Sequence, residues 1–434
     1  MSFLGTHGDL DLIFILKQTK MIKLSLWAQK LSLILGGIMA GIFIGELALH
    51  QGGIKGIEKP SDLVSLDSYT LDDPAGWSLK PGAYFEWQGE GDRSFIRANK
   101  DGLRDREHTK EKAPKTFRIA VLGDSFAESL QVPMENTFWW KMRKQLNKQC
   151  TALGDRKVEV INFGVQGYGT DQELITLRHK VWQYSPDLVI LAFLPGNDII
   201  NNSKKLEFSK RKPFFVYNNG ELVLDNSGLN ISQRQHNYLE FSSVDYLPTW
   251  LVNHSRILRL VRQIDLNNKK RLVDATEKKR SAHNFQEPID PVWKEAWQVT
   301  EGLITLMNRE VKTQKADFMI LIVSSGVQVN PEPMMRQSYV KRFGIKDLYY
   351  PNQRIKALGD RLNITTLDTV PRLREYAEKN KTCVHGFPNA MHCDGHWNSQ
   401  GHEQVGQLMA QNLCDRFKAE ASDSTNNNAL VKQK

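Results

Sequence analysis

Residues 117–125 read FRIAVLGDS, and this stretch decides the fold class. Phe117–Leu122 is a short apolar run rich in β-forming residues, and it ends directly in a glycine turn that carries Ser125. A continuous apolar run of this length is typical of a strand that is buried on both faces of a parallel sheet. In such sheets the functional crevice lies at the carboxyl ends of the strands, so we expect Ser125 to stand at that edge.

Three further runs along the chain have the same character. They read VEVINF at 158–163, DLVILAF at 187–193 and DFMILIV at 317–323. Amphipathic stretches flank them, for example Thr137–Leu146 and Gln172–Gln183. Short apolar strands that alternate with helical patterns predict an α/β fold, a three-layer α/β/α sandwich around a central parallel sheet.

The composition fits a globular chain long enough to bury a core. Of the 434 residues, 40% are hydrophobic and 25% are charged, which excludes wholesale disorder and collagen-like or coiled-coil architecture. The net charge of +9 is modest for this length and does not by itself predict nucleic-acid binding. We therefore expect no nucleic-acid partner, and the sequence predicts no particular oligomeric state.

A membrane anchor is predicted near the N-terminus. Residues 31–49 read LSLILGGIMAGIFIGELAL, in which Glu46 is the one charged residue. At about 1.5 Å per residue this run nearly spans a hydrocarbon core of about 30 Å. No A-x-A cleavage pattern follows it, so we interpret it as an uncleaved transmembrane signal anchor. The run is preceded by Lys17, Lys20, Lys23 and Lys30.

Those lysines also set the predicted topology. The positive-inside rule places residues 1–30 in the cytoplasm and the rest of the chain outside, in the periplasm if the cell is bacterial. We expect residues 50–115 to form a stalk and a small irregular subdomain, because they are rich in Gly, Pro, Asp and Trp. The main domain is expected at 116–417, with an insertion at about 199–290 where the strand–helix rhythm stops. Residues 418–434, rich in Asn, Ser and Lys, are expected to be disordered.

Polar residues follow the other predicted strands or lie near the C-terminus. They are Asn162–Gly167, Gly196–Asp198, and Asp394 with His396. Taken separately, each motif also fits a structural role as a helix cap, a glycine loop or a β-turn. Their order along the chain, Ser, Gly, Asn and then Asp with His, favours one shared active site.

With these residues the sequence resembles the SGNH (GDSL) hydrolase superfamily. Gly123–Ser125 resembles the first block of that superfamily, Asn162–Gly167 the second, Gly196–Asp198 the third, and Asp394 with His396 the last. The resemblance implies a flavodoxin-like fold. It covers about 116–200 and 310–415. The sequence at 99–107 and 167–172 also resembles a bacterial membrane-anchored branch of the superfamily.

The resemblance implies a role for each matching residue. Ser125 would be the nucleophile, His396 the general base, and Asp394 the carboxylate that orients the imidazole. The backbone N–H groups of Ser125 and Gly167 and the side chain of Asn197 would form the oxyanion hole. Such chemistry needs no cofactor and no metal.

The expected activity is that of a serine esterase that cleaves an O-acyl group on a glycan, or a small acyl ester, through an acyl-enzyme on Ser125. One departure bears on this expectation. Asp394 and His396 are two residues apart, whereas many family members place them three apart. The shorter spacing also occurs in relatives that include polysaccharide O-acetyltransferases, so that activity is one alternative. The other is a non-catalytic, membrane-tethered protein that binds or assembles glycans.

The four cysteines allow disulfides if the catalytic part lies outside the cytoplasm. Cys383–Cys393 would close a short loop beside the catalytic Asp and His, and Cys150–Cys414 would join two helix ends. Four cysteines permit three pairings, and the sequence does not choose among them. Histidines near Cys383 also suggest zinc, but no tidy ligand spacing is present.

Overall fold

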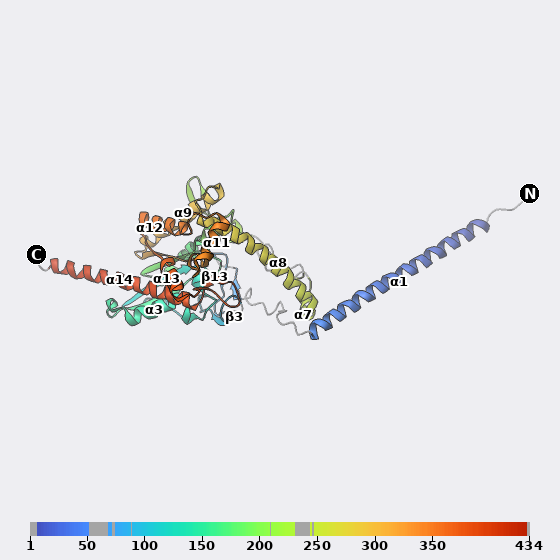
Figure 1. Ribbon diagram of the computed structural model, residues 1–434, viewed down its shortest axis with the longest axis horizontal. Coiled ribbons are helices and arrows are strands. Elements are labelled where there is room, and N and C mark those ends of the chain that lie inside the picture. The colour runs from blue at the N-terminus through green and yellow to red at the C-terminus, as the bar shows by residue number, and fades with distance from the viewer. Residues whose placement is uncertain are drawn as a thin grey trace, which may run out of the picture. The chain divides into compact units, whose positions relative to one another are not determined.

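The structure is a computed structural model that describes residues 7–51, 68–71, 74–87, 89–208, 210–230, 244 and 247–431 (Figure 1). The chain divides into two compact units. One consists of residues 1–63 with 238–271, and the other of residues 64–237 with 272–434. The second unit holds the predicted strands and all of the predicted site residues.

A five-stranded, wholly parallel sheet forms the centre of the second unit. Its strands run in the order β11-β10-β7-β5-β6, so β5, which ends in the glycine turn, lies inside the sheet between β6 and β7. This topology confirms the predicted fold class. The strands are β5 (Thr116–Gly123), β6 (Lys157–Asn162), β7 (Leu188–Phe193), β10 (Asp317–Ile322) and β11 (Thr365–Asp368).

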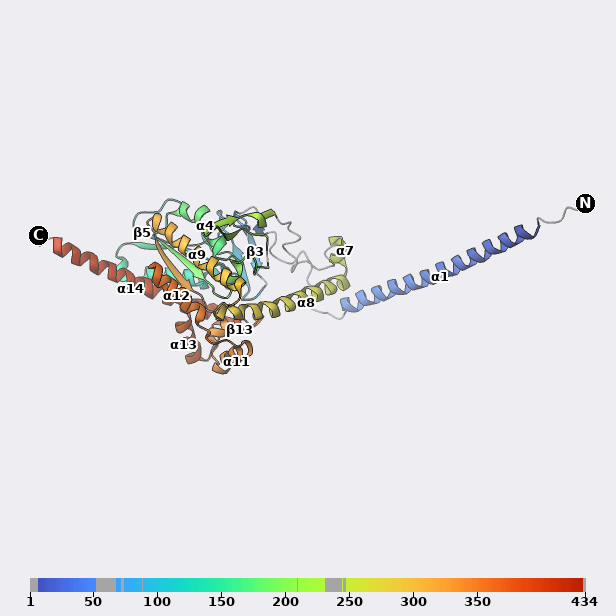
Figure 2. The same ribbon diagram turned by 90° about the horizontal axis from the view of Figure 1, so that it is seen from above.

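Alternate residues of β5 point to opposite faces of the sheet, and each face is covered by helices. Ala120 and Leu122 join a core formed with α4, α9 and α12, whereas Ile119 and Val121 join a core formed with α3, α13 and α14. Figure 2 shows α4 and α9 side by side on their face. These six helices are α3 (Phe138–Gln149), α4 (Thr170–His179), α9 (Pro291–Thr313), α12 (Tyr350–Leu362), α13 (Val370–Asn380) and α14 (Ser399–Val431).

Where the structure describes the segment before β5, residues 68–71, 74–87 and 89–115, it packs as part of this unit. It forms two short antiparallel pairs, β1 (Tyr69–Thr70) with β2 (Ser78–Leu79) and β3 (Tyr84–Trp87) with β4 (Ser94–Arg97). Leu79, Phe85 and Ile96 pack in one cluster with Leu130, which follows the nucleophile turn. The composition of 50–115 indicated irregular structure, and in its described part apolar side chains at spaced positions pack against the core.

The expected insertion at about 199–290 falls into both units, since residues 238–271 belong to the first. Disorder was expected at 418–434, whereas α14 runs from Ser399 to Val431. No proline or glycine interrupts the chain after Gly406. The remaining elements are α2 (Ser125–Glu128), α5 (Asp198–Asn201), β8 (Phe214–Asn218), β9 (Glu221–Asp225), α7 (Thr249–His254), α8 (Arg256–Ser281), α10 (Gly326–Val329), α11 (Pro333–Phe343), β12 (His385–Gly386) and β13 (His392–Trp397).

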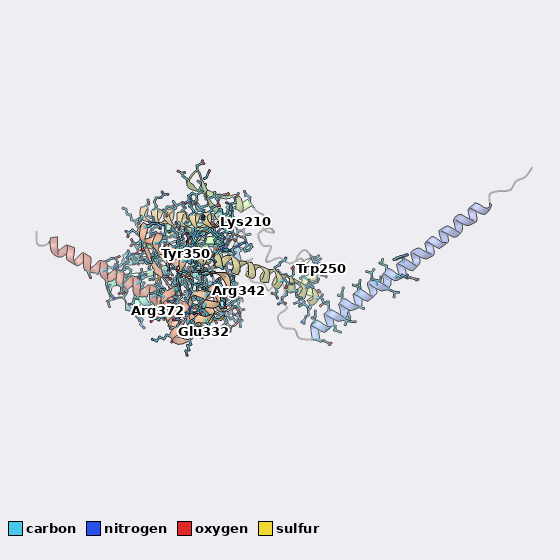
Figure 3. All side chains as sticks on the ribbon, turned by 45° about the horizontal axis from the view of Figure 1, so that its top comes forward. Lys210, Trp250, Glu332, Arg342, Tyr350 and Arg372 are labelled. Carbon is cyan, nitrogen blue, oxygen red and sulfur yellow. A yellow bond between two sulfur atoms is a disulfide. The ribbon has the colours of Figure 1, made fainter. Side chains whose placement is uncertain are left out.

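In the first unit, α1 (His7–Gln51) contains one stretch, Gln29–Gln51, that is long and apolar enough to cross a membrane. Glu46 lies in that stretch and accepts hydrogen bonds from the backbone N–H groups of Arg256 and Ile257, at the start of α8. The neighbouring α7 carries the exposed Trp250 (Figure 3). The charge of Glu46 is therefore matched by the N-terminus of a helix.

Two disulfides are present in the second unit. Cys150, at the end of α3, is bonded to Cys414 of α14, which is 264 residues further along the chain. Cys383 is bonded to Cys393 across the β12–β13 hairpin. The first bond fastens α14 to the end of α3, and the second closes the hairpin that carries His396.

Candidate active site

Ser125 lies where the sequence predicted it, directly after the carboxyl end of β5. It is the first residue of the short helix α2 and is almost wholly buried. Asp124 caps this helix, since its Oδ1 accepts a hydrogen bond from the N–H of Phe126 at 2.9 Å. The turn therefore has a fixed geometry before any ligand is bound.

His396 reaches Ser125 from β13, 271 residues further along the chain. Its Nε2 lies 2.7 Å from Ser125 Oγ. Its Nδ1 lies 2.5 Å from Glu90 Oε2. A carboxylate at Nδ1 fixes the tautomer with a proton on Nδ1, which leaves Nε2 free to accept the serine proton. Serine, histidine and a carboxylate thus form one continuous chain of hydrogen bonds.

The carboxylate in that chain is not the one expected from the sequence. Asp394 was expected beside the imidazole, but its Oδ1 accepts instead from the N–H of Gly395 at 3.0 Å. Two residues in β13, Cys393 and Gly395, have positive φ angles of 55° and 81°, so the regular alternation of a strand is broken there. Asp394 is consequently turned toward Gly326, and the position at Nδ1 is taken by Glu90.

The oxyanion groups expected from the sequence border the same turn. Asn197 Nδ2 donates to Asp124 Oδ2 at 3.0 Å. A side-chain amide has two N–H bonds, so this contact aims the second one while leaving it for a ligand. Burial raises the pKa of Asp124, and the hydrogen bonds from Phe126 and Asn197 oppose that rise.

Gly167 lies in the loop after β6, with a φ of 77°. Gln166, the residue before it, is held at both of its backbone groups, because Gln166 O accepts from Trp77 Nε1 at 3.0 Å and Gln166 N donates to Glu128 Oε2 at 2.7 Å. Since the carbonyl of residue 166 and the N–H of residue 167 belong to one planar peptide, fixing the carbonyl also fixes the direction of the N–H. Gly167 is therefore held in one orientation before a ligand arrives.

Residues of the segment before β5 hold the turn that follows Ser125 by hydrogen bonds to its backbone and to Glu128. The guanidinium of the fully buried Arg104 donates to the carbonyls of Glu128, Ser129 and Val132. Tyr69 Oη donates to Glu128 Oε1 at 2.9 Å. Burial raises the pKa of Glu128 to about 7 and lowers that of Arg104 to about 10.

A buried network also holds the loop that carries His396. His385 Nδ1 lies 2.7 Å from the carbonyl of Gly395, and its Nε2 lies 2.9 Å from Ser324 Oγ. Trp397 Nε1 donates to the same serine oxygen at 3.0 Å. Burial lowers the pKa of His385 to about 4, so this histidine is neutral at physiological pH and holds the loop as a hydrogen-bond donor.

Several carboxyl groups are buried beside Asp124. Asp171 pairs with Lys212 Nζ at 2.8 Å, and Asp198 Oδ2 accepts from the N–H of Leu194. Among the residues that the structure describes, neither carboxylate oxygen of Glu173 has a hydrogen-bond partner. Burial, followed by the charges of Asp124 and Asp171, raises the pKa of Glu173 well above its usual value.

A cavity of about 500 Å³ opens at His396. Its walls combine aromatic and aliphatic side chains with a few polar ones, as in most small-molecule sites. Arg342 of α11 lies on this wall (Figure 3). The larger apolar residues that line the cavity are Phe126, Leu194, Phe285, Met335, Tyr339, Phe343 and Met391.

The cysteine and histidine cluster lies at the edge of this cavity. Cys383, His392 and Cys393 bring their ligand atoms within 4.8 Å of one another. The two sulfur atoms are bonded to each other, and a disulfide offers no thiolate to a metal. In this oxidised form the cluster closes the hairpin and does not provide the donor set of a zinc site.

Comparison with known proteins gives matches among solved structures. No family model matches the chain, and no curated protein matches it. The chain is similar to the acetyl xylan esterase AlAXEase (12% identity, 68% of this chain and 98% of that one, TM-score 0.35). It is also similar to a member of the lipolytic protein G-D-S-L family from Veillonella parvula (11%, 68% and 97%, 0.33).

A catalytic mutant of an acetylxylan esterase from Geobacillus stearothermophilus is a third match (12% identity, 70% of this chain and 95% of that one, TM-score 0.34). The order of the motifs and the geometry of Ser125, His396 and their neighbours carry the functional assignment below.

Proposed function

We propose that this chain is a serine ester hydrolase of the SGNH type, with Ser125 as its nucleophile. The observation that carries the proposal is the 2.7 Å contact between Ser125 Oγ and His396 Nε2, in a ring whose other nitrogen meets a carboxylate. A nucleophile within hydrogen-bond reach of an oriented base is the arrangement that activates a serine hydroxyl. The cavity beside His396 supplies room for an ester.

The reaction proceeds in two acyl-transfer steps. Ser125 Oγ attacks the ester carbonyl while His396 takes the hydroxyl proton, and the developing oxyanion accepts hydrogen bonds from Ser125 N, Gly167 N and Asn197 Nδ2. His396 then returns the proton to the leaving alcohol, which leaves an acyl group on Ser125. A water molecule, deprotonated by His396, attacks the acyl-enzyme and releases the acid.

The proposed substrate is an O-acyl group on a glycan or a small acyl ester. The mixture of apolar walls with Arg342 and polar backbone at the cavity suits an ester whose two halves differ in polarity. We propose that α1 anchors the protein in a membrane with its N-terminus in the cytoplasm and the catalytic unit outside. Two disulfides in the catalytic unit support an oxidising compartment.

The test uses the full chain in detergent with p-nitrophenyl acetate and a fluorophosphonate probe. Wild type is expected to hydrolyse the ester and to be labelled at Ser125, and Ser125→Ala is expected to lose both signals. Ser281→Ala is the matched control, because it removes a hydroxyl at the same cavity without touching the Ser125–His396 pair. Equal turnover by wild type and Ser125→Ala would refute the proposal.

Two further outcomes separate the remaining functions. Supply of an acetyl donor with a glycan acceptor yields free acetate from an esterase and acetylated glycan from a polysaccharide O-acetyltransferase. A well-folded protein that is neither active nor labelled by the fluorophosphonate would refute catalysis, and the membrane-tethered glycan-binding or assembly function would then be tested by glycan binding.

A further inference from the structure

We infer that Glu90, from the turn between β3 and β4, is the positioning carboxylate of His396, and that the segment before β5 therefore completes the catalytic site. This inference rests on the proposed serine hydrolase function and assigns the third member of its hydrogen-bonded chain. Glu90 is separated from His396 by 306 residues and lies outside the part of the chain that carries the recognised motifs.

The contact between Glu90 and His396 is made by both carboxylate oxygens. Oε2 lies 2.5 Å from the ring Nδ1, and Oε1 accepts from the backbone N–H of the same histidine at 3.1 Å. One carboxylate thus fixes both the ring and the backbone from which the ring projects. Burial tends to raise the pKa of Glu90, but the hydrogen bonds and charge of His396 outweigh it, so its pKa lies below the usual value.

The catalytic loop is shaped to admit Glu90. A Cβ atom placed on Gly395 would lie 2.3 Å from Glu90 Oε1, which is far inside contact distance. Gly395 also has a φ of 81°, a conformation that side-chain-bearing residues rarely adopt. The glycine between Asp394 and His396 therefore leaves the space that Glu90 occupies.

The turn that carries Glu90 is clamped to the rest of the site. Asn389 Nδ2 donates to the carbonyl of Gly89 at 3.0 Å, and its Oδ1 accepts from the N–H of Gly91 at 3.1 Å. On the other side, the N–H of Asp92 donates to the carbonyl of Gln131, just after the nucleophile turn. The two residues that flank Glu90 are thus bonded to a single amide on the hairpin loop that precedes β13.

Asp394 is the alternative acid, and its geometry does not suit that role. Its Oδ1 accepts from the adjacent Gly395 N–H, and the hydrogen bonds of the His396 ring go to Glu90 and Ser125. Asparagine would keep the oxygen that accepts from Gly395. Asp394→Asn therefore removes a carboxylate from the loop that carries His396 and serves as the matched control for Glu90→Gln.

The experiment compares Glu90→Gln with Asp394→Asn in the full chain, with p-nitrophenyl acetate and fluorophosphonate labelling. Glu90→Gln is expected to lower kcat by about 10²–10⁴-fold with little change in KM, because the imidazolium loses its carboxylate and the tautomer is no longer fixed. The acid limb of kcat/KM against pH should move to lower pH. Asp394→Asn should stay within about threefold of wild type in kcat.

Chemical rescue keeps the test decisive if Glu90→Gln folds poorly. Glu90→Ala leaves a carboxylate-sized space that opens to solvent, since the Glu90 side chain is 19% exposed. Added formate should restore part of the lost kcat in Glu90→Ala and none in Ser125→Ala. A role in folding alone would not respond to formate.

The outcomes for the inference and for the proposed function are distinct. If Ser125→Ala is inactive but Glu90→Gln keeps wild-type kcat and pH profile while Asp394→Asn falls, Asp394 is the acid and the inference is overturned. If wild type and Ser125→Ala are equally active, the proposed function itself fails. Loss in Glu90→Gln with formate rescue of Glu90→Ala supports the assignment.

Discussion

The nucleophile turn and the loop that carries His396 meet at one hydrogen bond, yet they are held in place in different ways. Ser125 follows a central strand and is capped by its neighbour Asp124, so nearby residues in the sequence fix its position. His396 lies on a small hairpin that depends on Glu90, His385 and a disulfide. The Ser125 turn is set by its own strand and cap, and Arg104 from another segment holds the carbonyls that follow it. The hairpin of His396 combines local contacts, the disulfide and the His385–Gly395 hydrogen bond, with one contact to Glu90 across 306 residues.

On the Ser125 side of this comparison, a large effect is expected at the proposed oxyanion hole. Asn197→Ala removes an oxyanion donor that Asp124 aims, so kcat should fall by about 10²–10³-fold. Steady-state kinetics on p-nitrophenyl acetate would measure the change. Asn330→Ala, another amide at the same cavity, is the control and should stay close to wild type. Wild-type kcat in Asn197→Ala would remove this residue from the oxyanion hole.

The Cys150–Cys414 disulfide is expected to contribute to stability and not to catalysis. Replacing Cys150 and Cys414 with serine should lower the free energy of unfolding by about 2–4 kcal/mol, because a long loop is released. Since that bond lies away from His396, kcat/KM measured well below Tm should not change. Chemical denaturation and kinetics on the same sample would test both. A fall in kcat/KM without loss of stability would contradict this division.

A single added methyl group should disturb the histidine side. Gly395→Ala places a Cβ against Glu90 Oε1 and strains a backbone with a φ of 81°, so kcat/KM should fall by about 10–100-fold. Gly154→Ala is a matched control, because Gly154 also has a positive φ, of 61°, but no atom lies within 4 Å of its added Cβ. If both variants lose activity alike, backbone strain and not the contact with Glu90 is the cause.

A pH-dependent difference in stability is expected when Glu173, which is buried beside the Ser125 turn, is replaced with glutamine. Glu173 has a raised pKa in the folded protein, so above about pH 4.5 the unfolded chain loses this proton while the folded chain keeps it. That difference makes the wild type less stable as pH rises, by up to about 1.4 kcal/mol per pH unit.

Glu173→Gln has no such proton. Its stability relative to wild type should therefore be equal near pH 4 and greater at pH 7. Thermal unfolding at a series of pH values would measure this, with Glu332→Gln as an exposed control that shows no trend. A constant offset at all pH values would mean that Glu173 is not neutral in the folded state.

The sequence predicted the parts of the molecule whose signals are local. Strand β5 and the turn after it, with Asn197 after β7, follow from apolar runs that end in Gly, Asp, Ser and Asn. Strand β11 was missed because it has four residues, two of them threonine, and lies at the edge of the sheet. Glu90 was missed because no spacing in the sequence links it to His396.

The expected role of Asp394 shows the limit of the same reasoning. Asp394 lies two residues before His396, and the resemblance to the SGNH family implied that it orients the imidazole. On a regular strand, residues two apart would share a face. The positive φ angles of Cys393 and Gly395 break that rule in β13. Gly395 was the one feature of the sequence that pointed to Glu90, since a glycine at that position offers space for a residue from another part of the chain.

The bond between Cys150 and Cys414 bears on how the protein is made. A chain that crosses a membrane during synthesis presents Cys150 first, and the next cysteine to emerge is Cys383. Cys393 follows ten residues later and can close the hairpin bond before Cys414 arrives. The order of the cysteines thus limits mispairing of Cys150 to the short interval before Cys383 finds its own partner. If the unit crosses the membrane as proposed, the long covalent loop is sealed last, after almost the whole unit has emerged.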